Sequence, residues 1–239
     1  MKLLHEFEPV FNPTASGADA EFPASNAIET EYDPGVPWIA DSYIADAWLM
    51  VETTNIIDSV FLNRCNFPQA RIQWNATDEW SAPTVDLEVA LVRDDAKNRK
   101  GWFPITGVTG PGYLKVFIPA GQALDDSGTV PQIGNLICGQ AVTIPIVAEF
   151  DPRLVQDINS FKTFYGGYHE EPIGRAQHLI SMKIGDDLDP VRNMPKTWAL
   201  GVLFADLGNV GEAWLVYPAR DWSRPIRSLE DAGLSYAFR

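Results

Sequence analysis

Short apolar segments separated by turn-forming residues make up the first 150 positions of the chain. Residues 85–92, VDLEVALV, alternate apolar and polar side chains, which is the period of a strand with one buried face. Other segments with strand chemistry are residues 47–52, 56–63, 70–76 and 113–118. Turn formers such as NPTASG, DPGVP, TGPG and DDSG lie between them. Several short strands at this spacing predict an antiparallel sandwich or barrel.

The segment VPQIGNLICGQ, residues 130–140, has the apolar residues of a strand, but Gly134 and Gly139 interrupt it. Glycine inside a strand weakens the strand, so it marks a bulge or a close approach of another backbone. We therefore expect a strand here that bends or passes close to a neighbour.

The last part of the chain has a different pattern. Residues 176–184, 212–218 and 233–239 have strand chemistry, whereas residues 195–207 place Trp198, Val202 and Ala205 on one face of a helix. Pro195 in the first turn and a glycine after the last turn favour that helix. We predict two domains: a β-sandwich over residues 1–150, and a smaller β-rich domain with one helix over residues 151–239.

Charge narrows the range of partners. The formal net charge is −14, and residues 1–159 hold most of it, with 9 Lys/Arg against 22 Asp/Glu. Such a surface repels the phosphates of nucleic acids and of anionic membranes, so we expect no direct nucleic-acid recognition. No apolar run approaches the ~20 residues of a membrane-spanning helix, so we expect no membrane insertion.

The start of the chain and its cysteines favour synthesis in a cytosol-like compartment. The first ten residues, MKLLHEFEPV, lack the apolar stretch of a signal peptide. Cys65 and Cys138 are the only two cysteines, fewer than a disulfide framework usually needs. We expect both to be buried as small apolar side chains.

No catalytic constellation, cofactor motif or metal motif emerges. His169 lies beside Glu170 and Glu171, with His178 further on, but the spacing matches no zinc motif. The acidic pairs could bind calcium, yet none has the alternating spacing of an EF-hand loop, and turns are the favoured explanation for them. They are Asp94-Asp95, Asp125-Asp126 and Asp186-Asp187. We expect a protein that is not an enzyme, with no cofactor.

Eight tryptophans are many for this length, and four of them lie in or near predicted loops of the first part: Trp38, Trp48, Trp80 and Trp102. Exposed aromatic rings of this kind could form a platform for a sugar. Tryptophans in sandwiches are more often core or interface residues, which is the competing interpretation. The candidate ligand-binding residues are Trp38, Trp80 and Asp78.

The front of the chain resembles a galactose-binding-like jelly roll. It has a PASN turn at residues 23–26, a following Trp38, an apolar WL-V strand at residues 48–51, and an I--V-L-N-N strand at residues 57–66. The chain departs from the family pattern where ETTN follows the WL-V strand. The resemblance implies a jelly-roll β-sandwich over residues 1–150.

A second resemblance is to distal tail proteins of long-tailed bacteriophages. Such proteins close a jelly roll with IG-L--G, here residues 133–139, and continue with a GG segment, a basic strand, a helix and an apolar strand ending in proline. Residues 166–167, 175–184, 195–207 and 214–218 take these places. The resemblance implies a small assembly domain similar to tail-tube-type domains.

The phage resemblance implies a structural component of a tail tip or baseplate. Its expected partners are the tail tube, hub and tip proteins, and it is expected to form a homo-oligomeric ring. Its expected location is the virion tail, after synthesis in the bacterial host cytoplasm. The alternative is a carbohydrate-binding module that contacts a host-surface glycan through loops near Trp38 and Trp80. The two interpretations can coexist in one protein.

Overall fold

The computed structural model describes residues 2–4, 7–28, 36–42, 45–93, 98–125 and 130–143, and the strand backbones at 146–162, 168–184, 201–206, 211–216 and 234–238. The chain divides into two compact units. The larger unit is Lys2–Val142 with Leu200–Leu215, and the smaller is Thr143–Ala199 with Val216–Arg239. We describe each unit by itself.

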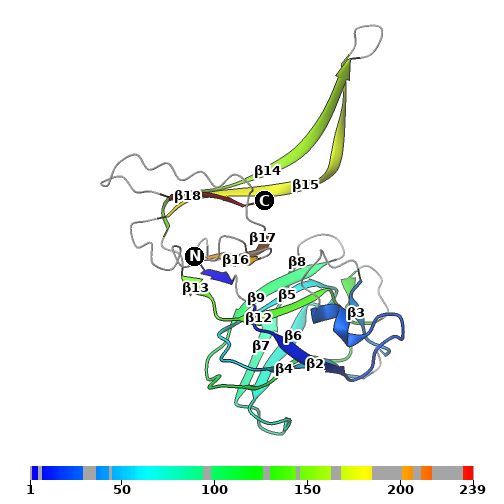
Figure 1. Ribbon diagram of the computed structural model, residues 1–239. Helices are drawn as coiled ribbons and strands as arrows, with labels where there is room; N and C mark the ends of the chain where they lie inside the picture. The colour runs from blue at the N-terminus through cyan, green and yellow to red at the C-terminus, as the bar shows by residue number, and fades with distance from the viewer. Residues whose placement is uncertain are drawn as a thin grey trace. The chain divides into compact units, whose positions relative to one another are not determined.

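Two antiparallel sheets form the body of the larger unit (Figure 1). The five-stranded sheet has the order β2 (Val10–Ala15), β4 (Ala47–Thr53), β10 (Gly112–Ile118), β6 (Gln69–Asn75) and β7 (Val85–Ala90). The four-stranded sheet has the order β12 (Asn135–Gly139), β5 (Ser59–Cys65), β9 (Arg99–Pro104) and β8 (Val92–Arg93). The chain passes repeatedly from one sheet to the other, as in a jelly roll. The predicted antiparallel jelly-roll sandwich is confirmed.

The core lies between these two sheets because alternate side chains of each strand point inward. In β4 and β10 the inward residues Leu49, Val51, Leu114 and Val116 are fully buried, and they share one cluster with Leu62 of the opposite sheet. Burial of each such side chain contributes about 1.5–3 kcal/mol relative to leaving it exposed. Short elements pack on the same core: the 3-10 helix η1 (Ala24–Ile28) and the paired strands β3 (Trp38–Ile39) and β11 (Gln132–Ile133).

An additional sheet covers the outer face of the four-stranded sheet. Its order is β13 (Val142–Thr143), β1 (Lys2–Leu4), β16 (Gly201–Asp206) and β17 (Gly211–Val216). Leu4 of β1 and Ala213 of β17 form a second apolar cluster with Phe61, Trp102 and Ile137. The four-stranded sheet therefore has an apolar cluster on each of its faces.

The helix predicted over residues 195–207 is wrong where the structure describes it, because residues 201–206 form strand β16. This strand pairs antiparallel with β1, with Leu3 opposite Leu203. An apolar run of this length fits a buried strand as well as a helix, and periodicity alone does not separate them. The deciding partner lies about 200 residues earlier in the chain, beyond any local pattern. Residues 195–200 and 207 lie outside the described part.

The smaller unit contains a long hairpin of β14 (Ile146–Lys162) and β15 (Tyr168–Ile184), with β18 (Leu234–Phe238) paired to the end of β15. The strands predicted at residues 176–184, 212–218 and 233–239 are confirmed within β15, β17 and β18. The predicted domain boundary after residue 150 falls within β14, whereas the compact units divide between Val142 and Thr143. The division into two domains with separate roles stays a prediction.

The glycine-interrupted segment forms β11 and β12, with Gly134 between them. The Gly134 amide donates to the carbonyl oxygen of Asn63 at 3.1 Å. A Cβ at Gly134 would lie 2.7 Å from the Cβ of Arg64. The close backbone approach expected from the sequence is therefore present at Gly134.

Candidate functional site

The outer face of the five-stranded sheet displays partly exposed aromatic side chains. Alternation along β4 and β10 turns Trp48, Tyr113, Lys115 and Phe117 away from the core, and all four are partly exposed. Phe117 lies directly opposite Trp48 in the register of the two strands. Together with Trp80, from the connection between β6 and β7, we call these residues the aromatic face.

The ammonium group of Lys115 lies over two indole rings. Its Nζ is 5.0 Å from the ring centroid of Trp48 and 4.9 Å from that of Trp80, and 6.0 Å from that of Phe117. An ammonium within about 6 Å of a ring centroid is attracted by the ring quadrupole. Burial lowers the pKa of Lys115, and the negative charge of Asp78 partly opposes that shift.

The connection between β6 and β7 presents Trp80 through its own hydrogen bonds. The side-chain amide of Asn75 donates to the Glu79 carbonyl oxygen at 2.7 Å, and Thr84 Oγ1 donates to Asn75 Oδ1 at 3.0 Å. Trp80 Nε1 donates to Asp78 Oδ1 at 2.6 Å. Asn75, which begins an N-A-T sequon, thus uses its side chain inside the turn.

Polar groups continue this face across β6 and β7. Arg71 forms an ion pair with Asp86, in which the Nε to Oδ1 distance is 3.0 Å. Gln73 Nε2 also donates to Asp86 Oδ1, at 3.2 Å. Arg71 lies opposite Phe117 and Gln73 lies opposite Lys115, so hydrogen-bonding groups adjoin the aromatic rings.

The structure brings together two of the three candidate residues. Trp80 is partly exposed and hydrogen-bonded to Asp78, but Trp38 lies in β3 with an exposed fraction of 0%. Trp38 belongs to the core because β3 pairs with β11. The sequence pattern had placed Trp38 in or near a loop. Among the other tryptophans proposed for the platform, Trp48 belongs to the aromatic face and Trp102 is buried.

Sequence reading missed Lys115 and Phe117. The signal was present in the segment YLKVFI, where Tyr113, Lys115 and Phe117 alternate with buried residues. The missing information was the neighbour relation between β10 and β4, which places Phe117 beside Trp48.

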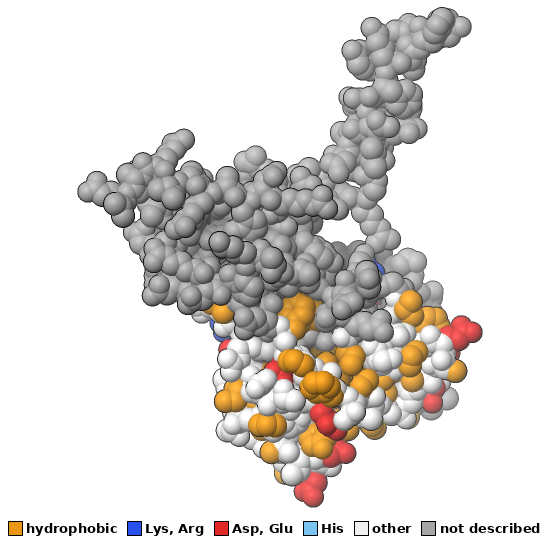
Figure 2. Space-filling model, in the orientation of Figure 1, with side chains coloured by type: hydrophobic (Ala, Val, Ile, Leu, Met, Phe, Trp, Pro, Cys, Tyr) orange, Lys and Arg blue, Asp and Glu red, His pale blue; other side chains and the backbone are white. Residues whose placement is uncertain are grey.

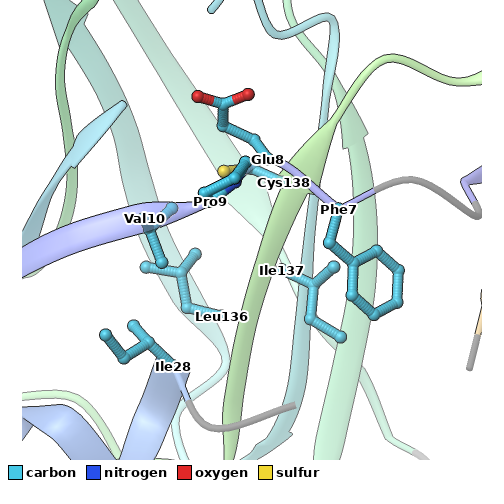
Figure 3. Close-up of a pocket in the computed structure, with 8 residues that line it drawn as sticks. All are labelled: Phe7, Glu8, Pro9, Val10, Ile28, Leu136, Ile137 and Cys138. Atoms are coloured by element: carbon cyan, nitrogen blue, oxygen red, sulfur yellow. The ribbon is translucent and has the colours of Figure 1, made fainter. Parts of the chain in front are cut away.

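A small cavity of about 250 Å³ lies near the end of β12 (Figure 3). Phe7, Glu8 and Cys138 are among its lining residues. The Glu8 carboxylate accepts hydrogen bonds from Thr54 N, Thr54 Oγ1, Asn55 N and Asn55 Nδ2 at 2.6–2.9 Å. These bonds occupy the carboxylate and link the β1–β2 connection to the β4–β5 turn, so Glu8 has a structural role.

The described residues contain no cluster of three or more His, Cys, Asp and Glu side chains that could hold a metal ion. Asp125, from one of the acidic pairs, instead forms ion pairs with Arg93 and Arg99. Cys65 and Cys138 are free and buried, as expected. The side chains of His169, Glu170, Glu171 and His178, and residues 94–95, 126 and 186–187, lie outside the described part.

One face of the described part shows hydrophobic side chains interspersed with polar ones, and acidic side chains in separate positions (Figure 2). The acidic side chains on this face accord with the negative net charge of the chain.

Among the described residues, no helix is long and apolar enough to cross a bilayer.

No protein-family model and no curated protein matches the chain. Solved structures that match include chitosan-binding module 1 of a chitosanase/glucanase from Paenibacillus sp. IK-5, at 16% identity, covering 53% of this chain and 92% of that one, with a TM-score of 0.39. A second is CBM32-1 of a family 31 glycoside hydrolase from Clostridium perfringens, at 10% identity, covering 54% and 94%, with a TM-score of 0.36. A third is from reduced XRCC1 bound to the DNA polymerase β catalytic domain, at 12% identity, covering 56% and 99%, with a TM-score of 0.44. Because every TM-score is below 0.5, these likenesses assign no ligand to this chain.

Proposed function

We propose that the chain is a carbohydrate-binding protein that uses its aromatic face. The observation that supports this proposal is that the Trp48 and Trp80 rings are both partly exposed and lie 5.0 Å and 4.9 Å from the Lys115 ammonium. A pyranose ring has an apolar face of C–H groups, which packs on an indole, and a rim of hydroxyl groups, which needs polar partners.

The polar partners lie on the same sheet. Arg71 and Asp86 are beside the aromatic residues, and their partly exposed ion pair offers guanidinium and carboxylate groups to sugar hydroxyls, whereas Gln73 is buried and donates to Asp86. Apolar surface with a few convergent polar groups is the usual composition of a ligand site. The residues from β4 to β6 span two strand spacings, roughly 10 Å, which is wider than one sugar ring. The expected ligand is therefore an oligosaccharide, bound without a catalytic step.

The proposal is tested by titrating the protein with a panel of oligosaccharides while monitoring amide and indole NMR signals. We expect the indole Nε1–H signals of Trp48 and Trp80 to shift with at least one glycan. Trp48→Ala and Trp80→Ala should each weaken binding at least tenfold. The matched control is Val92→Ala, a 53% exposed apolar residue of the other sheet, which should bind normally. Binding that survives both tryptophan changes would refute the proposal.

A second candidate function is that of a structural component in a phage tail tip, with the sugar-binding face as one of its parts. Two observations support it: the sequence resemblance given above, and the long hairpin of β14 and β15. No described strand pairs with the free edge of β14, and β18 pairs only with residues 180–184 of β15. Unpaired strand edges are templates for pairing with another chain.

Mass determination and negative-stain imaging test this second function, using the protein alone and mixed with tail-tube and hub proteins. Rings, or density at a tail end, would support a structural role. A monomer that ignores both neighbours would remove it and leave the carbohydrate-binding proposal intact.

A further inference from the structure

Two tryptophan rings of the aromatic face lie near one positive charge. Trp48 and Trp80 both lie about 5 Å from the Lys115 ammonium. Trp48 is fixed by β4, and Trp80 reaches the same charge from a separate turn held by Asn75. Two independent elements therefore converge on one cation.

The surroundings of the two rings also favour a cation. Asp78 lies close enough to Lys115 to oppose the effect of burial on that side chain, and its carboxylate is held by the indole N–H of Trp80. Met50 of β4 lies opposite Lys115 in the strand register. Glu52, two residues further along β4, is partly exposed and adds a second negative charge to the same face of the sheet. Arg71, the other cation of the sheet face, is already paired with Asp86.

We propose that the space between Trp48 and Trp80 is a binding site for an organic ammonium group of a ligand, and that Lys115 occupies it when no ligand is present. This inference deepens the proposed function, since it assigns a chemical class to one substituent of the glycan. The ammonium could be a free amine of an amino sugar or a choline group attached to a glycan. Aromatic recognition of quaternary ammonium groups rests on the same attraction that holds Lys115.

Lys115 can act as a displaceable occupant because its ammonium sits on a flexible four-carbon stem. Partial exposure of its side chain leaves it a path to solvent. A ligand ammonium that displaces Lys115 must replace the contacts of Lys115 with both rings. It must also overcome the repulsion between its own positive charge and that of the displaced Lys115. Removing Lys115 should therefore strengthen ligand binding, whereas a purely supporting role for Lys115 would predict the opposite.

The first test compares choline with 3,3-dimethylbutan-1-ol, a neutral molecule of nearly the same shape, at constant ionic strength set with sodium chloride. We expect choline to shift the indole signals of Trp48 and Trp80 in the wild-type protein, and the neutral alcohol to bind roughly three- to thirtyfold more weakly. Equal affinities, or no choline binding to either wild type or Lys115→Ala, would overturn the proposal.

The second test uses two variants that remove the same charge. Lys115→Ala should raise the affinity for choline roughly three- to thirtyfold. Lys100→Ala, on β9 of the other sheet, should leave it unchanged. A loss of choline binding in Lys115→Ala, with Trp80 still in its folded position by NMR, would assign Lys115 a supporting role and overturn the proposal.

The two sources of the ammonium are distinguished with glucosamine tetramers, their N-acetylated forms and phosphocholine-bearing glycans. Preference for the free amine indicates an amino sugar, and preference for phosphocholine indicates the substituent. If neutral and charged glycans bind equally well through Trp48 and Trp80, carbohydrate binding is supported and the ammonium-site proposal is refuted. If choline binds but no glycan does, the proposed function fails and the ammonium site stands alone.

Discussion

The indole Nε1 of Trp80 donates a hydrogen bond of 2.6 Å to the carboxylate of Asp78, two residues earlier in the same turn. Both residues belong to the segment ATDEW, in which the sequence suggested a sugar-binding turn. The bond uses the one polar group of the indole, so the other contacts of the ring are made by its carbon atoms, and the Lys115 ammonium lies over the ring. Asp78 therefore orients Trp80 and need not touch a ligand itself.

Substitution Asp78→Ala should loosen Trp80 and weaken oligosaccharide binding about three- to tenfold, the effect of one hydrogen bond. The Trp80 indole N–H signal should move to the position of a solvent-exposed indole even without ligand. Glu79→Ala removes the same charge from the next residue and is the control. If Glu79→Ala weakens oligosaccharide binding as much as Asp78→Ala does, the lost negative charge explains the effect and the orientation of Trp80 does not.

Removal of Trp38 should cost much more stability than removal of Trp80. Trp38→Ala empties a fully buried position and should lower the free energy of unfolding by about 3–5 kcal/mol. Trp80→Ala removes a partly exposed ring, one cation–π contact and an exposed hydrogen bond to Asp78, so its cost should be about 1 kcal/mol. Urea unfolding monitored by circular dichroism measures both. Similar losses of stability would show that Trp80 is also a structural residue.

The sandwich was predictable because strand period is local information. The alternation in residues 85–90 and 112–118 defines which side chains enter the core, whatever the neighbouring strand is. The aromatic face was only half predictable. Trp80 and Asp78 are close in sequence, but Trp48 and Phe117 meet through the pairing of β4 with β10 across 69 positions (117 minus 48).

Residues 201–206 illustrate a second limit of local reading. The segment GVLFAD can satisfy its backbone hydrogen bonds as a helix alone or as a strand with a partner. Strand β1, at the far end of the chain, supplies that partner. Trp38 was misplaced for the same reason, because its burial depends on pairing with Ile133.

Gly134 should not tolerate a side chain. Gly134→Ala brings a Cβ to 2.7 Å from the Arg64 Cβ and 3.1 Å from the Asn63 carbonyl oxygen, so β5 and the β11–β12 segment must shift. We expect a loss of about 1–3 kcal/mol in the free energy of unfolding. Gly110→Ala, where a Cβ meets nothing within 4 Å, is the matched control and should be nearly neutral. Equal stability of the two variants would contradict the close approach.

Both thiols should be unreactive in the folded protein. Burial raises the pKa of Cys65 and Cys138, and the charge of Glu8 adds to the effect at Cys138, so neither forms the reactive thiolate near neutral pH. A chromogenic disulfide reagent should detect no thiol in native protein and both after denaturation in urea. Rapid reaction of one thiol under native conditions would mean that its strand opens locally.

Glu8 should make stability depend on pH in the acidic range. Burial raises its pKa, but the hydrogen bonds from Thr54 and Asn55 outweigh burial and leave the pKa below its ordinary value of 4.5. A depressed folded-state pKa means that the stabilisation is complete above pH 4.5 and is lost as the pH falls through the folded-state value.

Glu8→Gln should therefore be less stable than wild type at neutral pH, by about 1–3 kcal/mol, because a neutral amide cannot accept the same four bonds. The gap between the two melting temperatures should narrow below pH 4.5. Some acid sensitivity should remain in the variant, since Asp125 also has a lowered pKa, chiefly through its hydrogen bond from Arg99. Thermal melts from pH 7 to pH 3 measure the effect (roughly the range in which carboxylates titrate). A constant gap across that range would show that Glu8 stays ionised throughout or contributes no charge-dependent stability.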